Sequence, residues 1–295
     1  MKIETVGLNS PGDMGQGVAQ VLIGNGLRVV AALDGRSERT RQLAAEVGVE
    51  NVGDLNGLVQ QSDVVLSILV PGAAVDAAGK MAEAMRETKR TPLYVDCNAI
   101  SVNSTKKVGE IVTAAGAPYV DASIIGPPPR VPGKTRFYAS GPAVADFQAL
   151  GAYGLDIRPL GPEVGKASGI KVCYASFTKA TTALATELLV SAKRMGLLDN
   201  LMQELSTSQK ALLGYAQQGL ERMPPKAHRW IAEMEELAAT YQGLGLTPRI
   251  LAGAADMYRD ISQTRLGLET PEEQRQHDRS FEEIIGMLEE DLPRG

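Results

Sequence analysis

Residues 7–17 decide the fold of this 295-residue chain, and they read Gly7-Leu8-Asn9-Ser10-Pro11-Gly12-Asp13-Met14-Gly15-Gln16-Gly17. The segment follows a strand-like stretch and opens a helix-like one. Glycines at such a turn let the backbone approach a pyrophosphate, and the helix N-terminus offers N–H groups and a positive dipole end. The alternative is an ordinary strand-to-helix turn without a ligand. The turn predicts a dinucleotide site that includes Gly7, Pro11, Gly12, Asp13, Met14 and Gly15.

The spacing of this turn departs from GxGxxG, because three extra residues separate Gly7 from Gly12. We therefore expect a phosphate loop that is longer than usual. A lone glycine triplet is weak evidence for a nucleotide site. A glycine turn between the first strand and the first helix of a βαβ unit is much stronger evidence.

The first 160 residues alternate short apolar runs with segments of helical period. The expected strands are Lys2–Leu8, Arg28–Leu33, Asp63–Val70, Pro92–Asp96, Tyr119–Ile125 and Arg136–Ser140. The expected helices between them are Met14–Asn25, Glu38–Val47, Ala73–Arg86 and Asn103–Ala115. Near-continuous apolar strands are typical of a parallel sheet covered on both faces. The pattern predicts a Rossmann-type, doubly wound α/β domain.

The pattern changes after Pro162. No proline occurs from Lys166 to Met195, and Ala, Leu, Val and Thr dominate this stretch, so a long helix is expected. Further helix-like segments are separated by Pro224-Pro225, by residues 243–248 and by Thr270-Pro271. We expect a dinucleotide-binding domain at residues 1–162 and an all-helical domain at residues 163–295.

Composition excludes several classes of function. Residues 1–162 hold 15 basic and 16 acidic side chains, and residues 163–295 hold 15 and 19, so neither half has the basic excess that nucleic acid requires. Two histidines and two distant cysteines form no pattern for a metal site. The start of the chain has no apolar signal region, and no apolar run approaches membrane-spanning length. We expect a cytoplasmic protein with no metal and no membrane or nucleic-acid partner.

The end of the second expected strand bears on the choice of coenzyme. Asp34 stands where an acidic residue would bind the ribose hydroxyls of NAD. Arg36 and Ser37 follow, and they are residue types that hold the 2′-phosphate of NADP. The alternative is that the basic residues here are solvated residues at a helix start. The sequence favours NADP over NAD.

Three motifs together resemble a known family. Gly12–Gly15 resembles its G-x-M-G, and Asp121–Gly126 resembles its D-A-P-V-S-G substrate loop. Gly161–Lys171 is similar to the G-x-x-G-x-x-x-x-x-K stretch that carries a catalytic lysine. The chain thus resembles the β-hydroxyacid dehydrogenases, relatives of 6-phosphogluconate and 3-hydroxyisobutyrate dehydrogenases, over residues 1 to about 195. The helical remainder, with Arg229–Glu236, resembles a domain found in a poorly characterised branch of these proteins.

The resemblance implies hydride transfer between a nicotinamide and a small carboxylate-bearing alcohol or carbonyl. Lys171 is implied as the acid/base, since a lysine can carry this proton when burial lowers its pKa. Val70 and Pro71 either line the nicotinamide pocket, as the family does at this place, or only mark the end of the strand at a proline. Asn98 either holds the nicotinamide carboxamide or the substrate, or caps the next helix. The implied substrate contacts are Ser123, Ile124, Ile125 and Gly126. Arg130 either clamps a carboxylate or is an exposed loop arginine.

The sequence departs from the family at two places. The family Asn, four residues after the catalytic lysine, is Ala175 here, so Tyr174, Ser176 or Lys179 would have to supply a polar group. Tyr174 and Lys179 lie near the face of Lys171 on a helix. The S-G-G of the substrate loop becomes Ile125-Gly126-Pro127, followed by two more prolines. These changes indicate a substrate unlike those of the well-known members.

Three functions stay open at this point. The leading hypothesis is an NAD(P)-dependent dehydrogenase or reductase of a small hydroxy acid. The alternatives are an imine reductase and a non-catalytic NADP-binding module, and retention of Lys171 speaks against both. The resemblance also implies a homodimer formed through the helical domain, with a small molecule as the other partner.

Overall fold

The computed structural model of the protein describes residues 2–294. The chain divides into two compact units, one up to Val172 and one from Cys173 onward. The division falls within the long helix α7 (Lys166–Arg194), whereas the boundary expected from sequence lies at residue 162.

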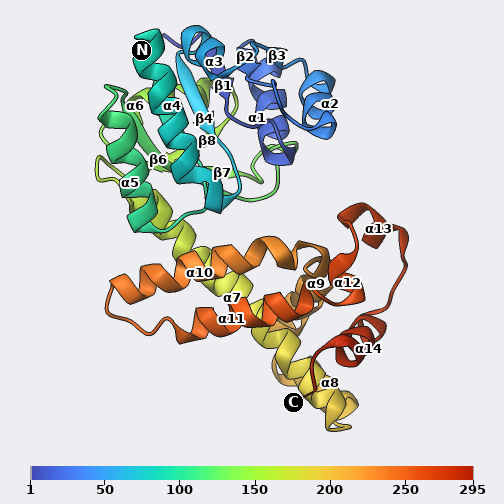
Figure 1. The fold of residues 1–295 in the computed structure, drawn as a ribbon. Coiled ribbons are helices and arrows are strands. Elements are labelled where there is room, and N and C mark those ends of the chain that lie inside the picture. The colour runs from blue at the N-terminus through green and yellow to red at the C-terminus, as the bar shows by residue number, and fades with distance from the viewer. Residues whose placement is uncertain (1, 295) are drawn as a thin grey trace. The chain divides into compact units, whose positions relative to one another are not determined.

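The first unit is built on one eight-stranded sheet (Figure 1). Its strands are β1 (Thr5–Leu8), β2 (Arg28–Ala31), β3 (Glu50–Asn51), β4 (Val64–Ser67), β5 (Leu93–Asp96), β6 (Tyr119–Ile125), β7 (Arg136–Ser140) and β8 (Asp156–Pro159). They lie in the order β3-β2-β1-β4-β5-β6-β7-β8. All neighbouring pairs are parallel except β6 and β7, which are antiparallel.

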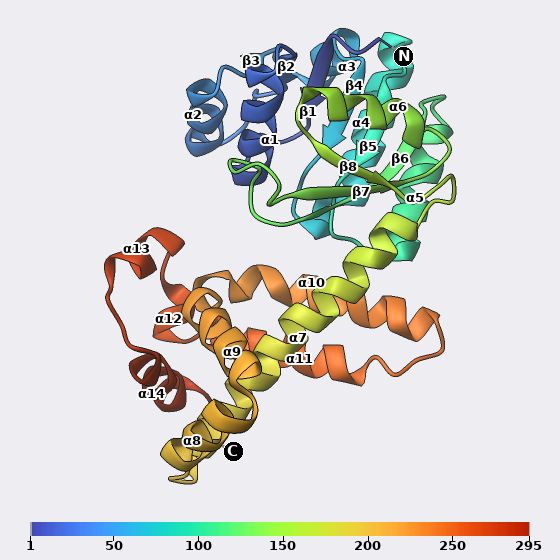
Figure 2. The same cartoon turned by 180° about the vertical axis from the view of Figure 1, so that it is seen from behind.

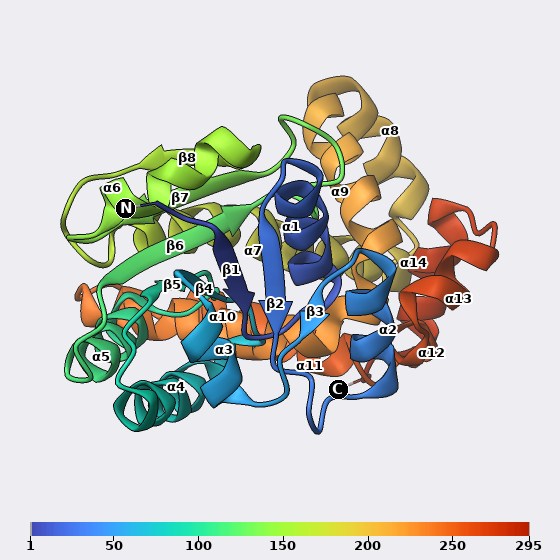
Figure 3. The same ribbon diagram turned by 90° about the horizontal axis from the view of Figure 1, so that it is seen from above.

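Helices cover both faces of this sheet (Figure 3). One face packs against α1 (Asp13–Gly24), α2 (Glu38–Glu46) and α6 (Val144–Gln148). The other packs against α3 (Leu55–Gln61), α4 (Ala74–Thr88) and α5 (Val102–Thr113). Because apolar side chains leave the strands on both sides, each face has its own buried core. The predicted Rossmann-type, doubly wound fold is confirmed.

Local sequence explains where several of these helices begin. Ser37, Asp54 and Ser101 cap α2, α3 and α5, and each accepts a hydrogen bond from a backbone N–H three residues on. Side-chain acceptors at these positions satisfy donors that the first helical turn leaves unpaired.

The second unit is helical and contains most of α7 (Figure 2). Its other helices are α8 (Leu198–Ser208), α9 (Lys210–Arg222), α10 (Ala227–Gly243), α11 (Arg249–Ile261), α12 (Arg265–Leu268), α13 (Pro271–Gln276) and α14 (Phe281–Asp291). Thr270 and Ser280 form capping boxes at the starts of α13 and α14. Within residues 2–294, no helix combines the length and the apolar character needed to cross a membrane.

Candidate active site

The carboxyl ends of the five central parallel strands meet at one edge of the sheet, where open α/β sheets bind their ligands. Four of the predicted cofactor segments follow these strands. They are the glycine turn after β1, residues 34–37 after β2, Val70 and Pro71 after β4, and Asn98 after β5. The fold therefore brings the predicted cofactor residues to the same edge.

The glycine turn leaves the start of α1 open. Gly12 is the N-cap residue and provides no side-chain cap, and a Cβ added to it would meet no atom within 4 Å. The first intrahelical hydrogen bond runs from Gln16 N to Gly12 O (2.7 Å), so the N–H groups of the three preceding residues point out of the helix. A Cβ on Gly15 would lie 2.4 Å from Ser10 O, which requires glycine there. These features fit a bound phosphate.

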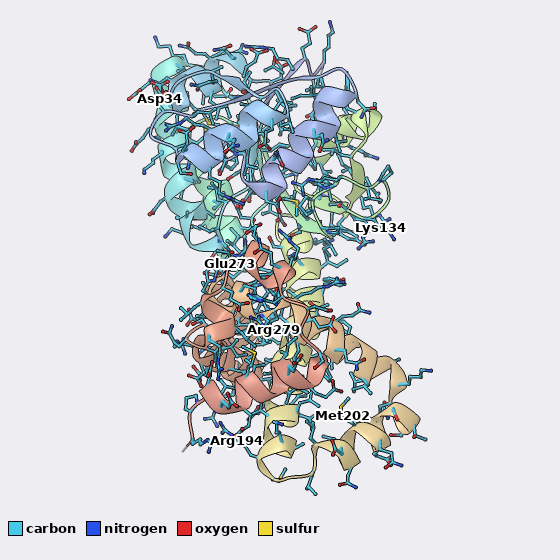
Figure 4. The ribbon with its side chains drawn as sticks, turned by 90° about the vertical axis from the view of Figure 1, so that its right-hand side faces the viewer. Asp34, Lys134, Arg194, Met202, Glu273 and Arg279 are labelled. Carbon is cyan, nitrogen blue, oxygen red and sulfur yellow. The ribbon has the colours of Figure 1, made fainter. Side chains whose placement is uncertain are left out.

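A cavity of about 510 Å³ lies beside this turn. Its lining includes Asn9, Asp34, Arg36, Leu69 and Lys80. Arg36 is held there because its guanidinium donates to Asn9 O at 2.8 Å. Ser37 lies just outside the lining, where its Oγ caps α2 by accepting from Thr40 N at 3.3 Å. Figure 4 labels Asp34, whose exposed side chain follows β2. The cavity fits the adenosine end of a dinucleotide.

Asn98 ties together the ends of β4 and β5. Its Oδ1 accepts from Leu69 N at 2.5 Å, and its Nδ2 donates to Ser67 Oγ at 3.1 Å and to Asp96. Ser101, not Asn98, caps α5. Asn98 thus positions the segment that leads to Val70, which is 62% exposed, and to Pro71, which opens the short helix Pro71–Ala73.

A row of polar side chains crosses the sheet near this edge. Ser67, Asp96, Asp121 and Ser140 are register neighbours on four adjacent strands, and all are buried. The Oδ2 atom of Asp96 has no hydrogen-bond partner among the described residues. Burial raises the pKa of Asp96 to about 7, with a smaller contribution from the nearby Asp121 carboxylate and against the lowering effect of the hydrogen bonds from Asn98.

Asp121 anchors the start of α7 to the sheet. One of its oxygens accepts from Ser140 Oγ (2.9 Å), Gly165 N (2.9 Å) and Ser168 N (3.1 Å). The other accepts from Ser168 Oγ (2.6 Å) and Thr105 Oγ1 (3.3 Å). Asp121 belongs to the motif that resembles the family's substrate loop, but no role was predicted for this residue. Its signal was an acidic residue flanked by Val120 and Ala122 within an apolar strand.

Lys171 lies in the second turn of this anchored helix. It is half-buried, and its Nζ donates to Ile124 O at 2.9 Å. Ser123, Ile124 and Ile125 are themselves buried within β6, so their side chains are not exposed to a ligand in this structure. Gly126 ends the strand with φ +129°, and a Cβ there would lie 2.2 Å from Lys134 O.

The proline-rich loop after Gly126 packs on α1. A Cβ added to Gly17 would lie 2.9 Å from Pro128 Cβ and 3.1 Å from Pro129 Cδ, so the third glycine of the turn serves this contact. Arg130 donates to Asp13 Oδ1 and Gln16 Oε1, each at 2.8 Å. Figure 4 labels Lys134, from the same loop. The predicted substrate residue Arg130 therefore lies at the start of α1, with its guanidinium bonded to that helix.

The two other predicted catalytic residues belong to the second unit. Tyr174 follows Lys171 by one helical turn and is 48% exposed. Lys179 forms an ion pair with Glu233 of α10, and its Nζ lies 5.0 Å from the Trp230 ring centroid. The Lys179 side chain is thus held between a carboxylate and an indole, so we leave it out of the catalytic group that we propose below. Its predicted role has no support in these contacts.

Across residues 2–294, no cluster of three or more His, Cys, Asp or Glu side chains has the arrangement of a metal site.

Two family models match the chain. Residues 2–146 match the NAD-binding domain of 6-phosphogluconate dehydrogenase, and residues 192–261 match a domain of unknown function, DUF1932. A protein of Methanothermus fervidus, described as an uncharacterised 28.5 kDa protein, is 30% identical over 62% of this chain and 69% of its own length.

Solved structures give the same picture. A conserved protein of unknown function, described as similar to 3-hydroxyacid dehydrogenases, is 30% identical with a TM-score of 0.67 over 87% of this chain and 97% of its own. The 3-hydroxyisobutyrate dehydrogenase of Mycobacterium tuberculosis with L-serine is 19% identical, with a TM-score of 0.71 over 97% and 99% of the two chains. An imine reductase of Myxococcus stipitatus with NADP⁺ is 17% identical, with a TM-score of 0.55 over 88% and 93%. On the match to the NAD-binding domain of 6-phosphogluconate dehydrogenase and the 30% identity to a protein similar to 3-hydroxyacid dehydrogenases, the chain belongs to the β-hydroxyacid dehydrogenase family.

Proposed function

We propose that the protein transfers a hydride between NADP(H) and a small carboxylate-bearing alcohol or its carbonyl, with Lys171 as the acid/base. The bound nicotinamide supplies or accepts the hydride. The observation that carries the proposal is the hydrogen bond from Lys171 to Ile124 O, which holds the lysine at the carboxyl end of β6. That strand end belongs to the edge that carries the predicted cofactor residues.

In this proposal Lys171 donates a proton to the substrate oxygen in reduction and removes it in oxidation. Asp121 acts as a positioning residue, because its hydrogen bonds to Gly165 N and Ser168 fix the turn that precedes the lysine. Tyr174, one turn after Lys171, is the proposed polar partner that replaces the family Asn at Ala175. The exposed Val70 side chain and Pro71 would cover one face of the nicotinamide.

The test is a screen of 2- and 3-hydroxy acids, sugar acids and their carbonyl forms for NADPH or NADH turnover, with cyclic imines as a parallel arm. With an active substrate, Lys171→Ala should lower kcat by about 10²–10⁴, the range expected for a general acid/base, with little change in coenzyme affinity. Lys166→Ala is the matched control, since Lys166 lies on the same helix in an exposed ion pair with Glu163 (3.2 Å).

Three outcomes would contradict the proposal. Undiminished turnover in Lys171→Ala would remove the lysine from the acid/base role. Turnover confined to imines would replace the hydroxy-acid assignment with an imine reductase. Tight NADPH binding without hydride transfer to any carbonyl or imine in the screen would indicate a non-catalytic binding module.

We also propose that NADP is the preferred coenzyme. Arg36 lines the adenosine cavity, and the Ser37 hydroxyl lies at the start of α2, a favourable place for a phosphate. Asp34 opposes this preference, since a carboxylate there suits a free ribose. The ratio of NADPH to NADH dissociation constants is the measurement. Arg36→Ala should reduce the preference, Arg39→Ala on the exposed side of α2 should not, and tighter NADH binding to the wild type would refute the proposal.

The proposed assembly is a homodimer formed through the helical unit. Large apolar side chains are exposed there, including Phe177 (68%), Leu184 (64%) and Ile250 (72%). Apolar surface of this kind is typical of association sites. Light scattering should give the mass of a dimer, and Leu184→Glu should lower it; a wild-type monomer at assay concentration would refute the proposal.

A further inference from the structure

Two buried carboxyl groups lie on neighbouring strands of the sheet, and the proposed function uses only one of them. Asp96 of β5 and Asp121 of β6 are register partners and are 1% and 0% exposed. Asp121 accepts five hydrogen bonds, two of them from backbone N–H groups. Asp96 accepts only from Asn98, through one of its oxygens, and its Oδ2 atom has no hydrogen-bond partner among residues 2–294. The protein therefore stabilises a negative charge on Asp96 much less than one on Asp121.

Within this cluster, Asp96 is the group that titrates near neutral pH. Burial raises the pKa of Asp96 to about 7. Burial also raises the pKa of Tyr94 and Cys97 on the same strand and of Tyr119 on β6, so these three groups stay neutral in this range. The charged neighbour is the Asp121 carboxylate, whereas β4 and α5 contribute a serine and a threonine hydroxyl, which do not titrate.

Hydrogen bonds connect Asp96 to the segment proposed to cover the nicotinamide. The Asn98 side chain donates to Asp96 and accepts from Leu69 N at 2.5 Å. Leu69 directly precedes Val70 and Pro71, the residues proposed to cover one face of the ring. Because Asp96 and Asn98 are both buried, a charge on Asp96 acts on this strand end through protein and not through water. Charges interact more strongly and with less screening by salt under these conditions.

We propose that the charge of Asp96 follows the oxidation state of the bound nicotinamide, with the carboxylate favoured by the oxidised ring and the protonated carboxyl favoured by the reduced ring. The oxidised ring carries one positive charge, and the reduced ring is neutral. A positive charge nearby lowers the pKa of a carboxyl group. By linkage, a rise in pH then tightens the binding of NADP⁺ relative to that of NADPH. This role of Asp96 rests on the proposed function, since it requires a bound coenzyme.

The experiment measures the Kd of NADP⁺ and of NADPH for the whole chain by isothermal titration calorimetry at pH 6 and at pH 8.5. The ratio of the two constants is compared, because the 2′-phosphate and its contacts are common to both forms and cancel. The ratio of the Kd of NADP⁺ to that of NADPH should fall about five- to tenfold from pH 6 to pH 8.5, as expected if the pKa of Asp96 is lower by about one in the NADP⁺ complex. NAD⁺ and NADH serve equally if they bind more tightly, since their rings carry the same charges.

Asp96→Asn removes the titrating group and keeps the oxygen that accepts from Asn98, so it reproduces the uncharged carboxyl at every pH. Its ratio should change by less than about twofold over the same pH range. Asp63→Asn is the matched control, because Asp63 precedes β4 at the amino end of the strand, where it accepts from two backbone N–H groups. This control should keep the pH dependence of the wild type. Lys171→Ala should keep it as well, which separates Asp96 from the proposed acid/base.

Three results would overturn this role of Asp96 while the proposed function stands. They are a wild-type ratio that is equal at the two pH values, an Asp96→Asn ratio that changes as much as that of the wild type, and loss of the pH dependence in Asp63→Asn. Failure of both coenzyme forms to bind would contradict the proposed function together with this role. Far-UV circular dichroism at both pH values checks that each variant is folded, and the wild-type ratio needs no variant, so it is a test in its own right.

Discussion

Replacing Asp121 tests whether the start of α7, and with it Lys171, is held by one buried carboxylate. Asp121 accepts five hydrogen bonds, three on one oxygen and two on the other. Two of the donors are the backbone N–H groups of Gly165 and Ser168, which have no freedom to turn away. The hydroxyl donors can rotate and become acceptors.

This difference predicts unequal effects of two substitutions. Asp121→Ala leaves both N–H groups buried without an acceptor, and an unsatisfied buried group costs about 1–3 kcal/mol, so the loss of stability should reach about 4 kcal/mol with the hydroxyl contacts included. Asp121→Asn keeps one carbonyl oxygen for the N–H groups and turns its amide toward Ser168 Oγ and Thr105 Oγ1. Its cost should be about 1–2 kcal/mol, mainly the lost charge near the helix start.

The assay is urea unfolding with two probes, because the chain has two compact units. Far-UV circular dichroism follows both units, whereas the fluorescence of Trp230 follows the second unit alone. In Asp121→Ala, the first unit should unfold at a lower urea concentration than in the wild type. Circular dichroism should therefore fall before the fluorescence of Trp230 changes. The reasoning is refuted if Asp121→Ala unfolds within about 1 kcal/mol of the wild type, or if the Asn variant is as unstable as the Ala variant.

Two further predictions concern the same unit. Burial holds the pKa of Asp96 at about 7, above its unfolded value, so the folded state binds the proton more tightly and the stabilisation is lost as pH rises from about 4 to about 7. Between pH 5 and pH 8 the wild type should therefore lose about 3 kcal/mol of unfolding free energy relative to Asp96→Asn, as measured by urea unfolding at the two pH values. A difference between the two proteins that does not change with pH would contradict the raised pKa. Gly17→Ala should destabilise by about 1–2 kcal/mol because its methyl group meets Pro128, whereas Gly24→Ala, at the open end of the same helix, should stabilise by about 0.5–1 kcal/mol. Thermal unfolding distinguishes the expected destabilisation in Gly17→Ala from the expected stabilisation in Gly24→Ala. An equal change of Tm in the two variants would exclude the steric cause.

Local pattern was sufficient for most elements of the sheet unit. The strands at Tyr119–Ile125 and Arg136–Ser140 have the predicted bounds, because their apolar runs are long and end in turn residues. The strand β3 was missed because it has only two residues, both exposed. β8 was missed because it is polar and half-exposed. The antiparallel direction of β7 was not predicted, since direction depends on pairing and not on periodicity.

The candidate site was predictable only as far as its segments are local. The glycine turn and the lysine motif were found because each lies within a dozen residues. Contacts between distant segments were not predicted. Gly17 packs against Pro128, and Arg130 donates a hydrogen bond to Asp13. A local sequence pattern does not contain contacts between residues more than 100 positions apart. The hydrogen bond of Arg130 to α1 could therefore not be predicted from the sequence around Arg130.

The proline loop and the glycine turn consequently form one packed piece. Pro128 and Pro129 fill the space that Gly17 leaves, and Arg130 bonds to Asp13 at the start of α1. Because α1 carries the N–H groups proposed for the phosphates, a change in the proline loop also changes the surroundings of the coenzyme. In the function we propose, substrate choice and coenzyme affinity would therefore be coupled through contacts within a single unit.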